Sequence, residues 1–167
     1  MSENTQPASN LSSEQQQALA RLAIQKAVAQ KSDELYEKYY EKDSSSSPAA
    51  KLLTAFRDAE KGMTQVRNLE NIAYSTGKLS DIYDFLKKQM GRPGDLGAQW
   101  RREGVGQQLL NDLTALRKDA KEIADQVRGK YAAGTGDDTE RQVHLMLCRE
   151  YVKHVAAHYQ YASKVRE

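Results

Sequence analysis

The sequence predicts an all-α protein, a bundle of five to six helices, and three observations support this fold class. Apolar residues recur at spacings of three and four through the long segments, which is typical of amphipathic helices. No window shows sustained alternation with β-branched enrichment, and no Asn-Gly or Asp-Gly hairpin turn occurs. Clusters rich in glycine, proline, serine or aspartate at residues 43–48, 91–97 and 132–138 separate the predicted helices.

The N-terminal part is predicted to be a disordered tail over residues 1–11, then a helix and a serine-rich linker over residues 12–47. Ser12 and Gln15 have the spacing of a capping box, and the helix after them is expected to reach about residue 42. Its apolar stripe is diluted by alanine, so this helix is expected either to pack loosely or to face a partner. The stripe consists of Leu19, Leu22, Ala23, Ile24, Ala27, Val28, Leu35 and Tyr39.

A helical bundle domain is predicted over residues 48–167. Ser47 can cap its first helix, and Pro48 suits the first turn, where the N–H that proline lacks is not needed. This helix is expected to end before Gly62.

The remaining helices are predicted from their capping residues and their apolar stripes. Thr64 is expected to cap a helix that ends before Gly77, and a shorter helix is expected over residues 79–89. The two longest helices are predicted over residues 105–131 and from residue 138 or 139 toward the C-terminus. Their apolar stripes are Val105, Leu109, Leu110, Leu113, Leu116, Ala120, Ile123, Ala124, Val127 and Tyr131, and then Val143, Leu147, Tyr151, Val155, Ala162 and Val165.

Composition excludes several classes of protein. The 167 residues suit one domain, with 39% hydrophobic and 29% charged residues and a mean hydropathy of -0.79. No apolar run approaches the roughly 20 residues that cross a bilayer, so no membrane partner is expected. The N-terminus lacks the basic start and apolar core of a signal peptide, which predicts a cytoplasmic location. Cys148 is the single cysteine, which excludes an intramolecular disulfide and a Cys-rich zinc site.

The charge is distributed unevenly, although the net charge is only +2. The segments after the serine tract each carry a small basic excess, whereas residues 1–50 are net acidic. The helix over residues 105–131 has a basic edge on one side of its stripe and an acidic edge, with Asp112 and Asp119, on the other. Cations and a tyrosine also recur at helical spacing over residues 67–78, and further cations lie on the outer face of the last helix.

These residues suit a phosphate backbone, because Arg offers a planar fork, Lys a mobile charge and Tyr a ring on which a base stacks. The alternative, that they are ordinary solvated helix faces, stays open at this stage. The candidate nucleic-acid contacts are Arg67, Tyr74, Lys78, Arg117, Lys121, Arg128, Arg149 and Lys153.

No catalytic or cofactor motif is found, so neither enzymatic activity nor a cofactor is expected. His144 and Cys148, like His154 and His158, are four residues apart, a spacing that can chelate a metal. Their placement on or near the apolar face favours core packing instead, and no metal site is expected. Trp100 is interpreted either as a contact for a partner or a base, or as a hydrophobic latch that closes the bundle.

Two segments resemble the small helical subunit of type III CRISPR interference complexes. They are the Thr-Gln-Val-Arg-Asn opening at residues 64–68 and the Glu-Tyr…Tyr-Gln-Tyr stretch at residues 150–161. The resemblance implies a non-catalytic subunit that stacks with copies of itself, contacts other subunits and holds the guide–target RNA backbone or the displaced strand. Arg67 and, less directly, Lys153 are the RNA contacts that it implies. Residues 1–47 and the insert at residues 91–104 depart from that family's pattern.

A second function also fits the sequence, that of a helical protein–protein adaptor or regulatory bundle. Its support is the N-terminal extension and two clusters of tyrosines, a residue type that is enriched at interfaces. The clusters are Tyr36, Tyr39 and Tyr40, and Tyr151, Tyr159 and Tyr161.

Overall fold

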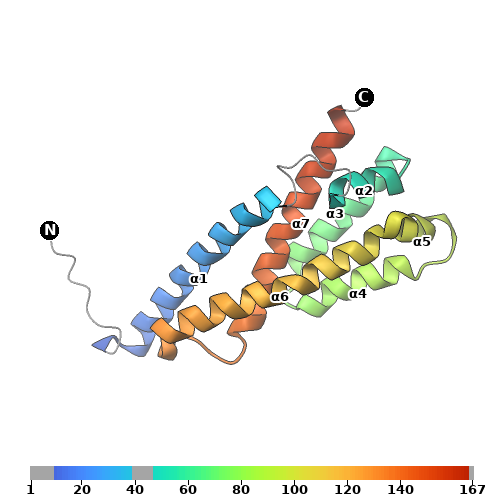
Figure 1. Ribbon diagram of the computed structural model, residues 1–167. Coiled ribbons are helices and arrows are strands. Elements are labelled where there is room, and N and C mark those ends of the chain that lie inside the picture. Colours follow the sequence, from blue (N-terminus) through green and yellow to red (C-terminus); the bar gives the residue numbers. More distant parts are fainter. Residues whose placement is uncertain (1–9, 39–46, 166–167) are drawn as a thin grey trace.

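The computed structural model describes residues 10–38 and 47–165, and the regular elements within these ranges are all helical (Figure 1). The predicted all-α bundle is confirmed. The α-helices are α1 (Ser13–Tyr36), α2 (Pro48–Ala55), α3 (Ala59–Ser75), α4 (Leu79–Met90), α5 (Gly94–Arg101), α6 (Val105–Lys130) and α7 (Thr139–Val165). Two short 3₁₀ turns, η3 (Arg102–Gly104) and η4 (Ala132–Gly134), flank α6.

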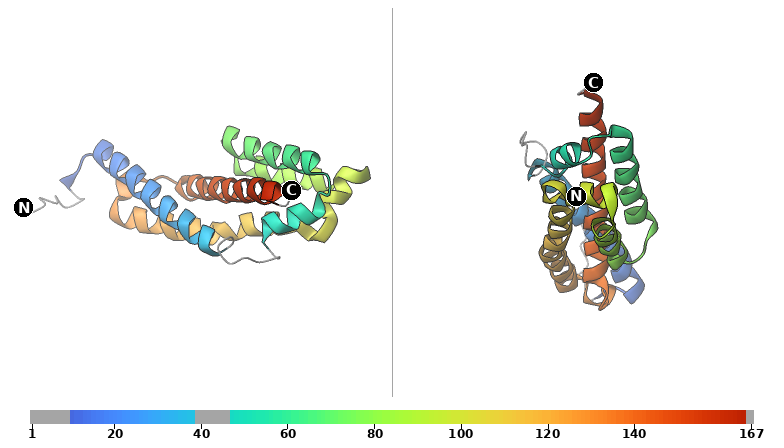
Figure 2. Two further views of the ribbon diagram at one scale, coloured as in Figure 1. Left: turned by 90° about the horizontal axis from the view of Figure 1, so that it is seen from above. Right: turned by 90° about the vertical axis from the view of Figure 1, so that its right-hand side faces the viewer.

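The two longest helices, α6 and α7, form the centre of the bundle. Helix α1 packs against both of them and against η4, while α2 to α5 gather around their other half (Figures 1 and 2). Helix α3 lies mainly on α7, and α4 and α5 contact α6. The centre of the molecule is therefore one helical hairpin that is covered at each end by different helices.

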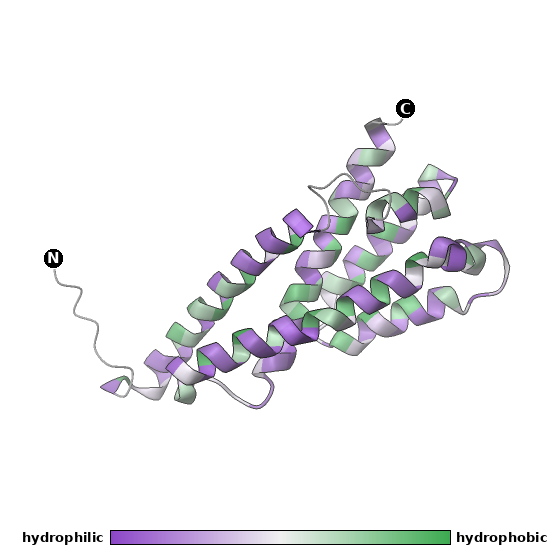
Figure 3. Cartoon of the chain, in the orientation of Figure 1, coloured by the Kyte–Doolittle hydropathy of each residue, from purple (hydrophilic) through white to green (hydrophobic). Residues whose placement is uncertain are grey.

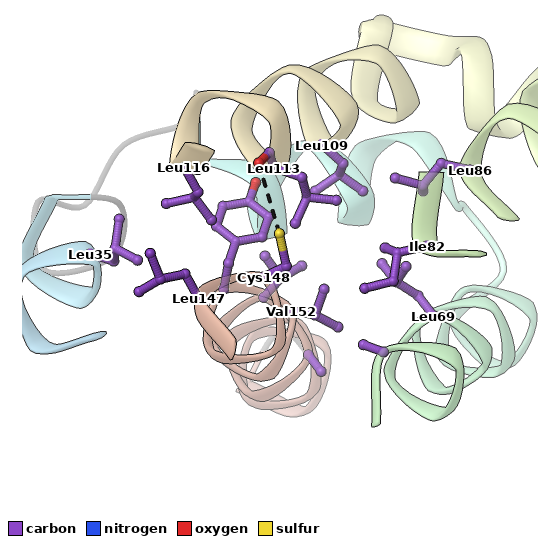
Figure 4. Close-up of a cluster of buried hydrophobic side chains, with 14 of the residues drawn as sticks. Leu35, Leu69, Ile82, Leu86, Leu109, Leu113, Leu116, Leu147, Cys148 and Val152 are labelled. Carbon is purple, nitrogen blue, oxygen red and sulfur yellow. Dashed lines mark hydrogen bonds between the residues drawn. The ribbon is translucent and has the colours of Figure 1, made fainter. Parts of the chain in front are cut away.

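The core is made by the apolar faces of these helices, whose outer faces are polar (Figure 3). Leucines at every fourth or third position of α6 meet α7 on one side and α4 on the other (Figure 4). Each fully buried side chain of this size contributes about 1.5–3 kcal/mol to stability. The residues shown there include Leu35, Leu69, Ile82, Leu86, Leu109, Leu113, Leu116, Leu147, Cys148 and Val152.

Helix α1 is part of this bundle. Its predicted capping box is confirmed by reciprocal hydrogen bonds between Ser12 and Gln15. The Ser32 hydroxyl donates to Glu150 of α7 at 2.8 Å, and Lys31 pairs with Asp119 of α6 at 3.1 Å. The α-helix is assigned as far as Tyr36, and its predicted limit of about residue 42 lies outside the described residues. Most of the predicted tail, the linker at residues 39–46 with its two tyrosines, and the last two residues lie outside the described ranges.

The boundary between α2 and α3 differs from the prediction. Ser47 caps α2 as expected, but α2 ends at Ala55, and α3 begins at Ala59 with Asp58 as its cap. Gly62 does not end a helix, because it lies inside α3 and is buried there. A Cβ at this position would overlap the Tyr159 hydroxyl, so the glycine allows α7 to approach α3 closely.

The interpretation of residues 91–97 as a break without helix is also wrong, because Gly94 begins the two-turn helix α5. Trp100 on this helix is completely buried, edge-on to Phe56 and Phe85. It is therefore the hydrophobic latch, and its interpretation as a contact for a partner or a base is wrong. Beside it, Arg101 donates to backbone carbonyls at the end of α4 and in the α4–α5 connection, and Arg102 donates to the last carbonyl of α2.

The last helix begins at Thr139, as predicted, and its histidines and cysteine lie where the apolar stripe places them. His144 and Cys148 are buried, and both lie within hydrogen-bonding distance of the Leu113 carbonyl of α6. Among the described residues, no group of three or more His, Cys, Asp or Glu is arranged to hold a metal ion. Within the same ranges, no helix combines the length and the apolar character needed to cross a bilayer.

Candidate nucleic-acid interface

The acidic edge of α6 is used inside the molecule. Asp119 binds Lys31 of α1, and Asp112 accepts a hydrogen bond from the Tyr151 hydroxyl of α7 at 2.6 Å. Burial raises the pKa of Asp112, although the hydrogen bond from Tyr151 acts in the opposite direction. The edge of α6 that faces outward is consequently the basic one.

That basic edge is largely neutralised by carboxylates of the same chain. Arg117 lies 3.5 Å from Glu140, while Lys121 and Arg128 share Asp125 at 2.8 and 3.4 Å. The hydrogen bond between Lys121 and Asp125 raises the pKa of the lysine and lowers that of the aspartate. Exposed pairs of this kind contribute only about 0.2–1 kcal/mol each. These pairs nevertheless show that the three cations of this α6 edge are not unpaired, as the prediction had assumed.

Arg149, another of the predicted nucleic-acid contacts, binds backbone carbonyls inside the molecule. Its guanidinium donates to the carbonyl oxygens of Ala73 at 2.9 Å and Thr76 at 2.7 Å. These carbonyls lie at the C-terminal end of α3, where helical partners are missing and a cation is favourable. Lys153 remains exposed and lies 3.9 Å from the Glu150 carboxylate.

The outer face of α3 carries the predicted contacts that remain available. Because α3 turns its buried face toward α7 and α4, Arg67 and Tyr74 are exposed on it, and Lys78 is exposed just beyond it, as the N-cap residue of α4. Arg67 and Lys78 form no ion pair with any residue in the described ranges. Tyr74 is 49% exposed, and partial burial, together with Glu150 and Glu70, raises the pKa of its hydroxyl. The hydroxyl therefore stays neutral near pH 7.

A groove of about 460 Å³ runs between the first turns of α3 and the last turns of α7. Arg67 and Lys164 stand in its lining, and Glu60 is the one carboxylate there. The complete lining is Ala59, Glu60, Met63, Thr64, Arg67, Gln160, Ser163 and Lys164. The packing of α7 against α3 thus places two cations that are far apart in the sequence, Arg67 and Lys164, in the lining of one groove.

Lys164 and Arg141 are the cations that sequence reasoning left out of the site. Gln160 and Lys164 are four residues apart on α7, which was the available signal for the first of them. Arg141 joins Lys78 in a second pocket near the start of α7. No sequence signal links these two, because only the packing of α7 beside the α3–α4 connection brings them together.

No protein-family model, curated protein or solved structure was found to match this chain. The class of protein that the fold and the groove define is therefore an all-α bundle with a mixed, locally cationic face along α3 and α7.

Proposed function

We propose that this chain is a non-catalytic helical subunit of a ribonucleoprotein complex, where it holds the RNA backbone without reading its sequence. The observation that carries this proposal is the groove between α3 and α7, which holds Arg67 and Lys164 without any ion pair to a described residue. The finer proposal is the small subunit of a type III CRISPR interference complex, with the guide and target RNA and neighbouring subunits as partners.

The positions of the two segments that resemble this family support the finer proposal. Residues 64–68 lie in the middle of α3 and residues 150–161 in the middle and later turns of α7, and these helices pack against each other. The groove is lined by residues from both segments. Two stretches that are far apart in the sequence therefore form one surface.

The chemistry of the groove suits phosphate. Arg67 can donate two parallel hydrogen bonds to one phosphate group, and Lys164 adds a second charge at short range. The Gln160 amide can donate as well. Contacts of this kind position a backbone but do not distinguish bases, which agrees with the absence of a base-reading motif in the sequence.

The decisive experiment compares two double variants in binding to a short single-stranded RNA over a range of salt concentrations. We expect Arg67→Gln with Lys164→Gln to weaken binding about tenfold, and to reduce the salt slope by about 0.7 for each phosphate that the variant no longer neutralises. The matched control is Lys121→Gln with Arg128→Gln, which removes the same charge from the α6 edge. It is expected to change affinity much less, because both cations are already paired with Asp125.

Equal reductions in affinity for the two variants would show that general charge, and not the groove, governs binding. Absence of salt-dependent RNA binding by the unaltered protein would refute the proposal altogether. Circular dichroism spectra of both variants should match that of the unaltered protein, because all four side chains are exposed.

One observation supports the second candidate function, a helical protein–protein adaptor. Leu22 is 61% exposed on α1 and Tyr161 is 70% exposed on α7, and exposed apolar and aromatic side chains favour protein contacts. Tyr151 and Tyr159 are fully buried, so they are core residues and not members of an interface cluster. Co-purification of one protein partner without nucleic acid, abolished by Tyr161→Ser, would favour this function.

A further inference from the structure

A second pocket lies at the connection between α3 and α4, against the first turns of α7. Its volume is about 590 Å³, within the range of about 300–1,000 Å³ that is usual for small-molecule sites. Two of its lining residues are cations and none is a carboxylate. The lining consists of Gly77, Lys78, Leu79, Ser80, Tyr83, Arg141, Gln142 and Leu145.

The two cations of this pocket form no ion pair within the described part of the chain. The side chains of Lys78 and Arg141 are exposed, and neither makes an ion pair there. Two carboxylates nearby lie outside the lining, since Asp81 accepts from a threonine hydroxyl at the end of α3 and Asp138 accepts from the Gln142 amide. An anion that entered the pocket would meet two cations and no carboxylate in the lining.

The remaining wall of the pocket is apolar and partly aromatic. Leu79 and Leu145 contribute aliphatic surface, and Tyr83 contributes its ring. The Tyr83 hydroxyl lies 3.4 Å from Nε2 of His144, and burial raises its pKa, so the phenol stays neutral near pH 7. An aromatic ring beside two cations is the arrangement that accepts a base together with its phosphate.

We infer that this pocket binds a nucleoside phosphate, with the base against Tyr83 and the phosphate between Lys78 and Arg141. The phosphate has two possible sources, a nucleotide of an RNA strand or a free mononucleotide. The RNA source rests on the proposed function, whereas the free-nucleotide source does not. The site is separate from the groove that holds Arg67 and Lys164, since the two share no lining residue.

The test titrates 5′-AMP and ribose 5-phosphate separately into the protein and follows backbone amide shifts by NMR. We expect AMP to shift amides at residues 77–83 and 141–145, and ribose 5-phosphate to bind about tenfold more weakly because it has no base to stack. Lys78→Gln with Arg141→Gln should weaken AMP binding at least tenfold. The matched control is Lys87→Gln with Lys88→Gln, which removes the same charge from the other end of α4 and should leave AMP binding unchanged.

The same variants are then tested with a short single-stranded RNA. Weaker RNA binding by the Lys78/Arg141 variant than by its control identifies the strand as the source. If the Lys78/Arg141 variant no longer binds AMP but binds RNA as its control does, the source of the phosphate is the free nucleotide. Either result supports a nucleoside phosphate site in this pocket.

No AMP-dependent shift at these amides, together with RNA binding equal to that of the control, would overturn the inference. The Arg67/Lys164 experiment would still decide the proposed function by itself. Equal affinity for AMP and ribose 5-phosphate would overturn the role given to Tyr83.

Discussion

Substitution of Gly62 by alanine tests the close packing that sets the spacing between α3 and α7, and with it the width of the groove. A Cβ at this position would overlap the Tyr159 hydroxyl and would lie 2.8 Å from the Cβ of Phe56. Tyr159 is fully buried, and its hydroxyl has no hydrogen-bond partner among the described residues. The ring therefore cannot move aside without disturbing the core.

The magnitude follows from two opposing effects. Alanine in place of a helical glycine contributes about 1 kcal/mol to stability, whereas overpacking a core of this density costs about 1–3 kcal/mol. Because the overlap involves a rigid ring and a second side chain, we expect the upper value and a net decrease of about 2 kcal/mol. The midpoint of thermal unfolding should fall by about 4–8 °C.

The assay is urea denaturation followed by circular dichroism. Gly129→Ala is the matched control, because Gly129 is also helical but a Cβ there meets nothing within 4 Å. It should raise stability by about 0.5–1 kcal/mol. Adding Tyr159→Phe to Gly62→Ala should restore part of the stability, since it removes the overlapping oxygen. A Gly62→Ala protein as stable as the Gly129→Ala protein would refute the close approach of α7 to α3.

Two further predictions concern buried groups. Trp100→Ala should lower the free energy of unfolding by about 3–5 kcal/mol in urea denaturation, because the ring is fully buried against Phe56 and Phe85; a decrease below about 1 kcal/mol would contradict the latch. Burial lowers the pKa of His154 and of His158, with the neighbouring His154 adding to the effect on His158, so stability should fall as the pH drops below about 6.5 and level off below the folded pKa values. NMR titration checks this, and a folded pKa above about 6.5 for both rings would contradict it.

Local sequence signals were sufficient for the elements that are specified locally. Helix α6 is observed over Val105–Lys130, within one residue of the prediction, because its apolar stripe is regular and glycine precedes it. The caps at Ser12 and Ser47 were also predicted, since a cap depends on residues only three positions away. Gly62 was misjudged because a glycine that ends a helix and a glycine that admits a neighbouring ring look the same in sequence.

In the candidate site, too, the features that depend on one helix were predicted correctly and the contacts between helices were not. Helical spacing placed Arg67 and Tyr74 on one outer face of α3, and both are exposed there; Lys78 is exposed too, but it lies past the end of α3, as the N-cap residue of α4. The same reasoning selected Arg117 and Arg149, which the structure pairs with Glu140 and with the carbonyls at the end of α3. Spacing along one helix shows which way a side chain points, but it does not show which groups of other helices lie opposite it.

The sequence by itself therefore determined the helical architecture, the composition of the core and the outward direction of the charged side chains, because each depends on periodicity within one segment. Only the tertiary structure decided which cations are neutralised within the chain and which lie free beside a hollow. Those outcomes depend on distances between helices that are far apart in the sequence, and the packing of α7 against α3 and α6 sets these distances.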